Sequence, residues 1–495
     1  MQDLPLPKTP DAAGYASAAH TGALLLGAAR PASKDVARWA HQQEEIEKHW
    51  AAPARALLWP PRSGKTRAIA DHLQRLEAER GVTRTLIIAP QFVCKTVWPE
   101  ELERIGRSAL DLSSGPLVQR KTRLTWMRQS KPSPGIHAIV LVNWDALARL
   151  VPEILAWGPQ LVIADEAHYA KAAGAARSRA YHRICAQAQY RRALTGTPTP
   201  RDYIDAYSIW KGLDPSIFGT SKAAFERRYC ELDPWGRPKF YRNLPELQTK
   251  MHSISSVFDR AKAWRDMPPQ IVSRRLALPP DVRALYDDLV KKTVAEWEGV
   301  EIDATHKLAR ITKLQELTAG FITNEQGEPV WVHETKIEAA VSECVDLVNA
   351  REQVVVFYHF TPEGKRLEER LIEEVGRDAV ARVGGDVSVA TRVDLQKRFN
   401  GRGTPRIMVM QDSLGIGISL KAASYLVRMS YPLDYAAYLQ SNERIYEPGK
   451  PLTYVTLDVE RSVDQFARRV CMDKKRASDE LLGLGFEGVA LGLAA

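Results

Sequence analysis

Residues 56–73 read ALLWPPRSGKTRAIADHL, an apolar run, a Gly-Lys-Thr tripeptide and a helical pattern in succession. A strand, a tight turn and a helix in this order make the phosphate loop of nucleotide-binding α/β proteins. The lysine of such a loop reaches the β- and γ-phosphates, the hydroxyl binds magnesium, and N–H groups at the helix start hold the anion. We therefore expect a triphosphate site here. It would be formed by Arg62, Ser63, Gly64, Lys65 and Thr66.

The start of this stretch departs from the usual loop. The first glycine of the pattern is expected five residues before Gly64, where Trp59 stands, and the turn holds Pro60, Pro61 and Arg62. Arg62 either adds a phosphate contact or points to solvent, as long cationic side chains usually do. Because a Gly-Lys-Thr tripeptide alone is a weak signal, the assignment depends on the rest of the chain.

A second signal lies in residues 160–168, QLVIADEAH, where an apolar run ends in two adjacent acids. One carboxylate can hold magnesium through water while the other polarises the attacking water, so this pair completes a hydrolysis site. We expect Asp165 to hold the metal together with Thr66, and Glu166 to act on the water.

Short apolar runs alternate with helical patterns along the chain, which indicates parallel α/β units. The predicted strands lie at residues 55–59, 85–90, 138–144, 160–168, 353–360, 379–385, 406–411, 425–430 and 453–459. In an open parallel sheet, ligands bind beyond the carboxyl ends of the strands, where the polar residues of this chain appear. The predicted fold class is α/β, with two parallel-sheet lobes and a helical insertion between them.

The domain organisation follows from these strands. Residues 1–35 would be a loosely ordered lead-in without the basic start of a signal peptide, 36–214 the first lobe, 215–335 a helical insertion and connector, and 336–495 the second lobe with a C-terminal helix. The insertion is rich in aromatic, proline and basic residues, and it becomes helical through residues 281–299 and 306–321.

The composition favours an anionic partner, because the formal net charge is +9. Nucleic acid is expected before a membrane, since no apolar run approaches the roughly 20 residues of a spanning helix. A basic surface that serves solubility alone is the open alternative. The five cysteines are scattered without a C-x-x-C pair, which indicates a reducing compartment and a cytoplasmic protein.

The order of the motifs resembles that of superfamily 2 helicases, and specifically the Swi/Snf-type DNA translocases, including their phage and bacterial members. The resemblance covers about residues 36–485, and seven motifs occur in order. The stretches that carry it are residues 85–102 with Trp98, 139–147, 165–181, 194–215, 354–371, 412–445 and 453–475, besides the phosphate loop. Family phosphate loops often have glycine where Arg62 stands, although viral relatives with arginine occur.

The resemblance implies two RecA-like lobes with ATP bound between them. A glutamine before the phosphate loop would read adenine: Gln42 is the better match and Gln43 a rival, while both could simply be polar residues of an amphipathic helix. From the second lobe, the residues implied to bind ATP are Gly417, Gln440 and Arg444.

The last motif departs from the family pattern. A second arginine is expected three residues after Arg444, but Glu447 stands there, and Lys450 occupies a position where glutamine is common. An arginine finger stabilises the charge on the transferred phosphoryl group, and a carboxylate would oppose it. Either Arg444 carries this role, or another cation moves in, or hydrolysis is impaired.

Contacts to DNA phosphates are implied at the strand ends of both lobes. The residues are Lys95, Asn143, His359, Phe360 and Gly384. Each could instead be structural. Within the insertion, Arg237, Lys239 and Arg242 alternate with aromatic residues, a composition that suits phosphate contact but also fits a solvated hairpin.

These features together predict a monomeric, DNA-dependent ATPase that translocates on DNA, with double-stranded DNA favoured over single-stranded DNA. Its cofactors would be ATP and magnesium, and it would act in a bacterial or phage-infected cell without a membrane partner. A strand-separating helicase and a hydrolysis-poor, ATP-switched DNA clamp are the alternatives. A nuclease subunit gains little support, because no separate nuclease-like cluster is visible.

Overall fold

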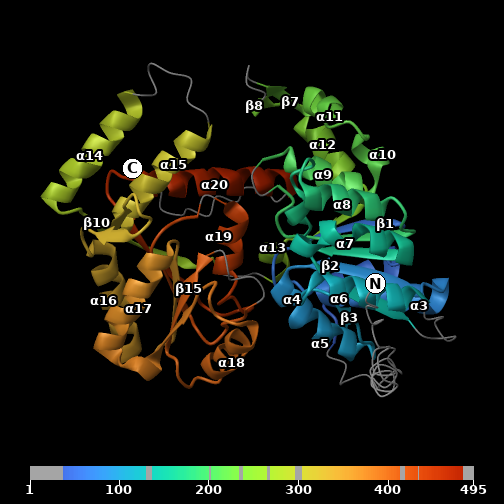
Figure 1. The fold of residues 1–495 in the computed structure, drawn as a ribbon, viewed down its shortest axis with the longest axis horizontal. Helices are drawn as coiled ribbons and strands as arrows, with labels where there is room; N and C mark the ends of the chain where they lie inside the picture. The colour runs from blue at the N-terminus through green and yellow to red at the C-terminus, as the bar shows by residue number, and fades with distance from the viewer. Residues whose placement is uncertain are drawn as a thin grey trace, which may run out of the picture. The chain divides into compact units, whose positions relative to one another are not determined.

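The computed structural model describes residues 37–129, 137–199, 202–232, 238–264, 268–295, 304–412, 418–432 and 434–482. They form two compact units. The first comprises the described residues up to 198 together with 204–258, and the second comprises 199–203 together with the residues from 259 onward. In Figure 1 the chain colour runs from blue to green in the first unit and from yellow to red in the second.

The first unit is built on a seven-stranded sheet in the order β3-β4-β2-β5-β6-β1-β9, in which every pairing is parallel. Its strands are β1 (Ala54–Leu58), β2 (Arg84–Ala89), β3 (Leu110–Asp111), β4 (Ala138–Asn143), β5 (Leu161–Asp165), β6 (Tyr190–Leu194) and β9 (Ser255–Val257). All five residues of β1 and of β5 are buried. A parallel strand covered on both faces needs such a continuous apolar run, which is why the sequence revealed these strands.

Helices cover this sheet and extend the unit. They are α2 (Ala40–His49), α3 (Lys65–Arg80), α4 (Gln91–Lys95), α5 (Val97–Arg104), α6 (Leu117–Gln129), α7 (Trp144–Trp157), α8 (Ala176–Cys185), α9 (Asp205–Leu213), α10 (Pro215–Phe218), α11 (Lys222–Tyr229), α12 (Leu244–His252) and the 3-10 turn η1 (Ala167–Ala170). A hairpin of β7 (Cys230–Leu232) and β8 (Pro238–Tyr241) adjoins α11 and α12.

Three neighbouring strands of this sheet end at the same level. In the register of the pairs, Leu194 of β6 lies opposite both Leu57 of β1 and Asp165 of β5. The segments that follow β1, β5 and β6 are the phosphate loop, the acidic pair and the hydroxyl-rich turn that begins at Thr195. The parallel topology therefore brings these three motifs, which are far apart in sequence, to one edge of the sheet.

The second unit has a six-stranded parallel sheet in the order β10-β17-β16-β13-β15-β14. Its strands are β10 (Gln270–Leu276), β13 (Val354–Tyr358), β14 (Val380–Val383), β15 (Ile407–Gln411), β16 (Tyr425–Arg428) and β17 (Thr453–Val459). The predicted class, α/β with two parallel-sheet lobes, is therefore confirmed. Sequence reasoning missed β10, since Arg274 and Arg275 are exposed on this edge strand and leave no continuous apolar run.

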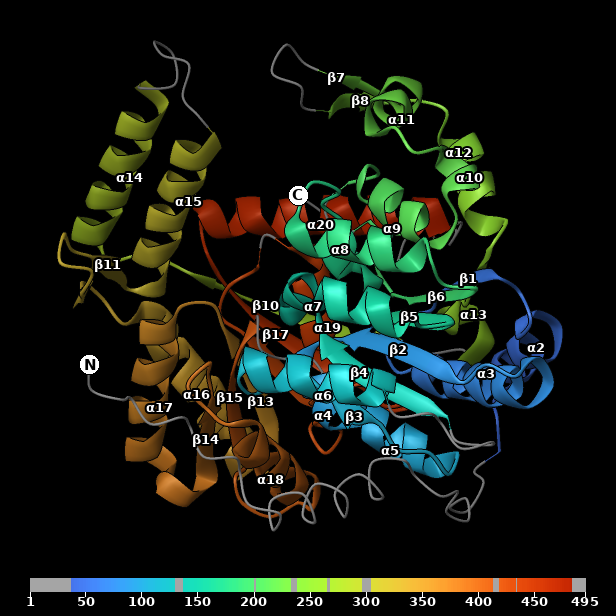
Figure 2. The same ribbon diagram turned by 45° about the vertical axis from the view of Figure 1, so that its right-hand side comes forward.

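The helices of the second unit are α13 (Arg260–Trp264), α14 (Pro280–Ala295), α15 (Ala304–Ala319), α16 (Thr335–Asn349), α17 (Thr361–Val375), α18 (Val389–Asn400), α19 (Tyr435–Asn442), α20 (Val463–Leu482) and the 3-10 turn η2 (Arg377–Ala379). A small hairpin joins β11 (Phe321–Thr323) and β12 (Pro329–Trp331). Helices α14 and α15 lie side by side in both views (Figures 1 and 2), and Val282, Tyr286 and Leu317 pack together between them. No helix in the described part of the chain is long and apolar enough to cross a membrane.

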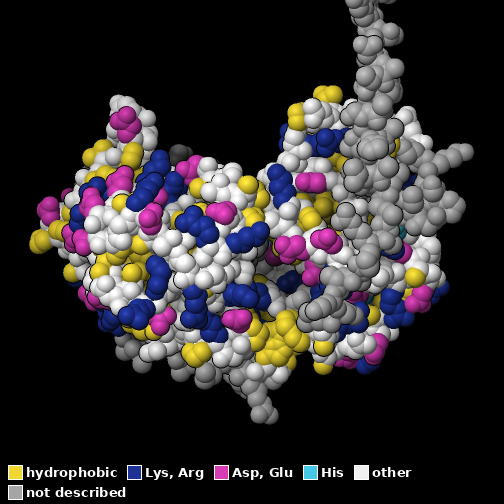
Figure 3. Space-filling model, turned by 90° about the horizontal axis from the view of Figure 1, so that it is seen from below, with side chains coloured by type: hydrophobic (Ala, Val, Ile, Leu, Met, Phe, Trp, Pro, Cys, Tyr) yellow, Lys and Arg dark blue, Asp and Glu magenta, His cyan; other side chains and the backbone are white. Residues whose placement is uncertain are grey.

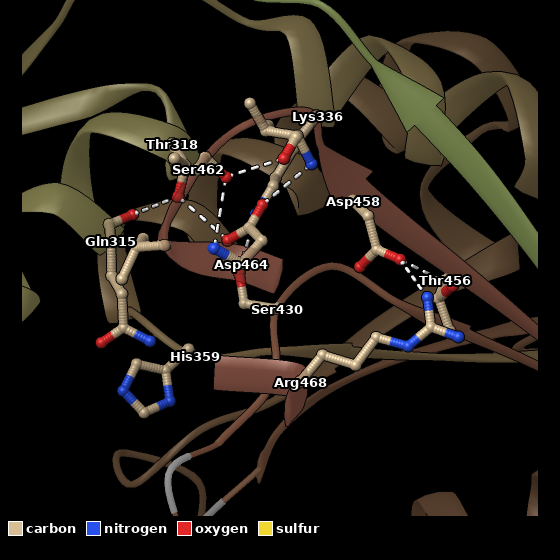
Figure 4. A network of polar contacts seen from close by, with 12 residues as sticks. Gln315, Thr318, Lys336, His359, Ser430, Thr456, Asp458, Ser462, Asp464 and Arg468 are labelled. Atoms are coloured by element: carbon tan, nitrogen blue, oxygen red, sulfur yellow. Dashed lines mark hydrogen bonds and ion pairs between the residues drawn. The ribbon is translucent and has the colours of Figure 1, made fainter. Parts of the chain in front are cut away.

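A buried ion pair joins several elements of this unit (Figure 4). Lys336 of α16 is 0% exposed, and its Nζ lies 2.7 Å from Oδ2 of Asp464 at the start of α20. The same ammonium donates to Ser430 Oγ at 3.2 Å, while Asp464 accepts bonds from Thr318 Oγ1 at 3.2 Å and from the Val459 amide at 3.0 Å. Every charge in this cluster has a partner, which is the condition for burying charges without a large loss of stability.

We predict that Lys336→Met lowers the free energy of unfolding by about 3–5 kcal/mol, because it leaves the Asp464 carboxylate buried without its cation. Urea denaturation measures this loss. Lys48→Met is the control, since Lys48 and Glu44 form a pair with side chains 62% and 63% exposed, and it should leave the free energy of unfolding nearly unchanged because water screens such a pair. Equal losses in the two variants would contradict the role given to Lys336.

Candidate functional site

The phosphate loop is closed by the lysine that the sequence singled out. Lys65 is buried, and its Nζ donates to the backbone oxygens of Trp59 at 2.9 Å and Pro60 at 3.0 Å. The loop backbone is left-handed at two positions, Arg62 with φ +62° and Gly64 with φ +76°. A non-glycine residue in this region costs about 1–2 kcal/mol, which explains why glycine suits position 62 in other loops of this kind. The Arg62 side chain is half-buried.

Side chains at the start of α2 hold this loop from outside. Gln42 Nε2 donates to Gly64 O at 3.2 Å, and its Oε1 accepts the Trp39 amide at 2.9 Å. Gln43, the rival in the sequence, is exposed and donates to Glu47 Oε1 on the same helix. Of the two glutamines, therefore, Gln42 is the one that contacts the phosphate loop.

His41 also binds the loop, and sequence reasoning missed it. Its Nε2 lies 2.9 Å from Ser63 O, and because a carbonyl oxygen only accepts, this nitrogen carries the proton. The ring stacks on Phe258 at 3.8 Å between centroids. Burial lowers the pKa of His41, which keeps the imidazole neutral near pH 7. The carbonyls of two successive loop residues are thus held by α2.

Three hydrogen bonds hold Asp165 at the end of β5. Trp98 Nε1 donates to its Oδ2 at 3.0 Å, the Glu166 amide donates to its Oδ1 at 2.9 Å, and Trp144 Nε1 donates to its backbone oxygen at 2.8 Å. Burial, followed by the charge of Glu166, raises the pKa of Asp165 to about 7, while Lys65 and the Trp98 bond act in the opposite direction. The ammonium and the two carboxylates therefore lie within electrostatic reach of one another.

Glu166 is held by the neighbouring turn. Its backbone is left-handed with φ +50°, and its Oε2 lies 3.2 Å from His168 Nδ1. The same nitrogen is 3.4 Å from Oγ1 of Thr195, whose amide donates to Leu57 O at 3.1 Å. The following residue, Gly196, packs so closely on the phosphate loop that an added Cβ would lie 3.1 Å from Trp59 O. His168 was missed in the sequence, although it stands two residues after Glu166.

The residues suit a magnesium ion, although no group of three or more His, Cys, Asp or Glu side chains in the described part of the chain forms a complete metal cage. Magnesium in triphosphate sites takes few protein ligands and otherwise binds phosphate and water oxygens. The Asp165 carboxylate, which is buried beside Glu166 and near Lys65, could supply one such oxygen ligand. Thr66 follows Lys65 in the first turn of α3 and is half-buried.

The candidate residues of the second unit cluster around the end of α19. Gln440 and Arg444 are buried, and Arg444 Nη1 donates to Ile418 O at 3.2 Å. The backbone oxygen of Arg444 accepts the Leu420 amide at 2.8 Å. Glu447 is exposed and lies in a turn, where its backbone oxygen accepts a hydrogen bond from the Lys450 amide at 3.1 Å. Gly417 lies outside the described residues.

The predicted DNA contacts fall at carboxyl ends of strands in each unit. In the first, Lys95 is exposed at the end of α4 after β2, and Asn143 is the last residue of the neighbouring strand β4. In the second, His359 and Phe360 follow β13, and Gly384 follows β14. Both of these strands pair with β15, so their ends lie at one edge of that sheet.

The turn at residues 359 and 360 is fixed by a buried carboxylate. Oε2 of Glu363 accepts the amides of His359 at 3.0 Å and of Phe360 at 3.2 Å. Burial lowers the pKa of His359, so its ring is neutral near pH 7. A half-buried, neutral imidazole offers a hydrogen bond rather than a charge to a phosphate.

The insertion forms the hairpin considered from the sequence. Strands β7 and β8 are antiparallel, Phe240 is 59% exposed, and the exposed Arg242 donates through Nη2 to Arg227 O at 2.5 Å. Arg237 and the side chain of Lys239 lie outside the described residues.

One face of the molecule shows how its charges are distributed. On the face drawn in Figure 3, Lys and Arg side chains are interspersed with Asp and Glu. The net charge of +9 therefore does not by itself locate a binding surface on this face.

Comparison with known proteins adds the family. Residues 37–315 match the SNF2-related domain, and residues 335–449 match the helicase conserved C-terminal domain. The chain is 25% identical over 377 residues to the SWI/SNF-related matrix-associated actin-dependent regulator of chromatin subfamily A-like protein 1 of Xenopus tropicalis, a match that covers 74% of this chain and 36% of that protein. It is also 25% identical over 379 residues to the human DNA annealing helicase and endonuclease ZRANB3, with 74% and 33% covered. The chain thus spans about a third of the length of these relatives.

A similar fold occurs in the crystal structure of the DUF1998 helicase MrfA bound to DNA and AMPPNP. The TM-score is 0.55 at 12% sequence identity, and the match covers 89% of this chain and 51% of that one. At this identity the similarity shows the fold alone.

We predict that Gly64→Ala weakens binding of a fluorescent ATP analogue at least about tenfold. A Cβ at this position would lie 2.0 Å from Gln42 Nε2, so Gln42 must leave the loop, and the left-handed backbone adds strain of about 1–2 kcal/mol. Gly81→Ala is the matched control at the other end of α3, with φ +64° and no atom within 4 Å of the added Cβ. It should keep the affinity. Equal affinities in the two variants would contradict a nucleotide site at this loop.

Proposed function

The chain belongs to the SNF2-related family, and from this premise we propose that it is a DNA-dependent ATPase that couples ATP hydrolysis to translocation on DNA. The observation that carries the proposal is the meeting of Lys65, Asp165 and Glu166 at one edge of a parallel sheet, beside a loop whose backbone is already left-handed. An ammonium, a buried carboxylate and a second carboxylate in this setting are the parts that phosphoryl transfer to water requires.

Each residue of this edge has a role that fits its contacts. Lys65 exchanges its bonds to two loop carbonyls for phosphate oxygens when a triphosphate enters. Thr66 and Asp165 would hold magnesium, which would supply positive charge to the triphosphate. Glu166 orients and polarises the attacking water, and His168 holds its carboxylate in place.

Residues beside the loop and from the second unit complete the proposed ATP site. Gln42 keeps one N–H and one lone pair after binding the loop, and these can meet the edge of adenine. Arg444 supplies positive charge to the transferred phosphoryl group, and Gln440 and Gly417 belong to the same site. Because Glu447 is exposed in a turn, Arg444 carries this role without the second arginine of the family pattern.

Double-stranded DNA is the proposed track, and the protein acts as a monomer. Lys95, Asn143, His359, Phe360 and Gly384 would contact the phosphate backbone from strand ends of the two units, as polar groups and backbone amides do at such edges. Arg237, Lys239 and Arg242 of the insertion would add contacts, helped by the exposed ring of Phe240.

We predict that Lys65→Ala and Glu166→Gln both abolish DNA-stimulated ATP hydrolysis, measured by phosphate release. Glu166→Gln keeps the shape of the side chain and removes only the charge that acts on water, so it should bind nucleotide nearly as well as the wild type. Glu100→Gln, at an exposed position of α5, is the control and should keep full turnover. Persistent DNA-stimulated turnover in Glu166→Gln would refute the assignment.

Affinity for duplex DNA should fall steeply with salt, because neutralised phosphates release their counterions. Replacing Arg237, Lys239 and Arg242 together by alanine should flatten the plot of log affinity against log salt by about 0.9 for each phosphate that the variant no longer neutralises. Fluorescence anisotropy at several salt concentrations measures the slope, with Lys48→Ala on α2 as the control. An unchanged slope in the triple variant would make the hairpin a solvated surface element.

A further inference from the structure

The second unit contains another buried cation, Arg428 at the end of β16, which binds three side chains from two different elements. Its side chain is 1% exposed, and Nη1 donates to Asp412 Oδ1 at 2.9 Å. Its Nη2 donates at 2.7 Å to Ser441 Oγ and at 2.7 Å to Asn442 Oδ1. One planar fork thus joins a carboxylate that follows β15 to the last two residues of α19.

Aromatic rings enclose the guanidinium. Its central carbon lies 4.9 Å from the ring centroid of Tyr438 and 5.4 Å from that of Phe357. Such faces attract a desolvated guanidinium, and they also prevent the side chain from turning toward solvent. The orientation of the fork is therefore fixed from several sides.

The groups that Arg428 binds flank the candidate arginine finger. Ser441 and Asn442 directly precede the turn that leads to Arg444, and the Arg444 amide donates to Ser441 O at 3.1 Å. On its other side, Arg444 Nη1 donates to Ile418 O and its backbone oxygen accepts the Leu420 amide. The helix end that supports the Arg444 backbone is therefore held by Arg428.

We propose that Arg428 is a positioning residue, which fixes Arg444 for phosphoryl transfer by tying the end of α19 to Asp412, the residue after β15. This inference rests on the proposed ATPase function. It also explains how one arginine can serve where Glu447 replaces the second: a single finger needs a rigid base, because misplacement by about 1 Å can cost about 100-fold in rate.

The test separates positioning from stability. Arg428→Met should lower kcat for DNA-stimulated ATP hydrolysis by about 10- to 100-fold, with less than about a threefold change in KM for ATP, since the nucleotide is still bound by the first unit. Arg428→Lys should recover part of kcat, because a lysine restores the charge beside Asp412 but not the planar fork.

A double variant guards against simple loss of folding. Arg428→Met leaves Asp412 buried and unpaired, whereas Arg428→Met with Asp412→Leu removes both charges and should recover much of the melting temperature. Its kcat should stay low. Arg468→Met is the matched control: it breaks the pair between Arg468 and Asp458 in the same unit, with side chains 22% and 7% exposed, shown in Figure 4. It should keep kcat within about twofold of wild type.

Several outcomes would overturn the inference. Recovery of kcat together with melting temperature in the double variant would make Arg428 structural, as would an equal loss of kcat in Arg468→Met. Wild-type turnover in the same assay distinguishes this failure from failure of the proposed function. A wild type without turnover contradicts both, and a wild type whose kcat equals that of Arg428→Met contradicts the positioning role alone.

Discussion

The balance of charge among Lys65, Asp165 and Glu166 is the constraint on which the first unit depends. Asp165 is buried next to Glu166 and within electrostatic reach of the buried Lys65 ammonium. Burial, followed by the charge of Glu166, raises the pKa of Asp165 to about 7, and Lys65 opposes this rise. Such an arrangement is costly unless hydrogen bonds fix it, and Trp98 and Trp144 supply them. The magnesium ion proposed to enter with the nucleotide would bring further positive charge to these carboxylates. The unfavourable burial of Asp165 beside Glu166 is therefore the feature that would suit this edge of the sheet to magnesium and a triphosphate.

The phosphate loop shows how the fold replaces glycines that the sequence lacks. Arg62 adopts a left-handed backbone that glycine would reach without strain, and His41 and Gln42 of α2 hold the carbonyls of the next two loop residues. The second unit lacks the second arginine of the family pattern. There the guanidinium of Arg428 binds the residues that precede Arg444. Arg62 replaces a glycine of the family pattern, and contacts from α2 hold the loop around it. Glu447 replaces an arginine, and Arg428 of β16 holds the residues before Arg444.

The sequence predicted the parts of the fold that depend on local pattern. Buried parallel strands such as β5 need unbroken apolar runs, and the motifs lie just after them, so strands, order and candidate residues could be predicted together. Edge strands such as β10 carry exposed charges and gave no such signal. His41 and Arg428 were missed because their roles depend on residues distant in sequence: Ser63 for the first, and Asp412, Ser441 and Asn442 for the second. Within the pattern of β16, Arg428 was an interruption of an apolar run.

ATP turnover of the full chain, measured with duplex DNA, with single-stranded DNA and without DNA, tests the central claim most directly. We expect slow turnover alone, a clear rise with duplex DNA and a smaller rise with single strands, because the edge residues of both units are proposed to contact a duplex backbone. Turnover that is absent, or equal in all three conditions, would contradict a DNA-dependent ATPase. A larger rise with single-stranded DNA would contradict the duplex as the track.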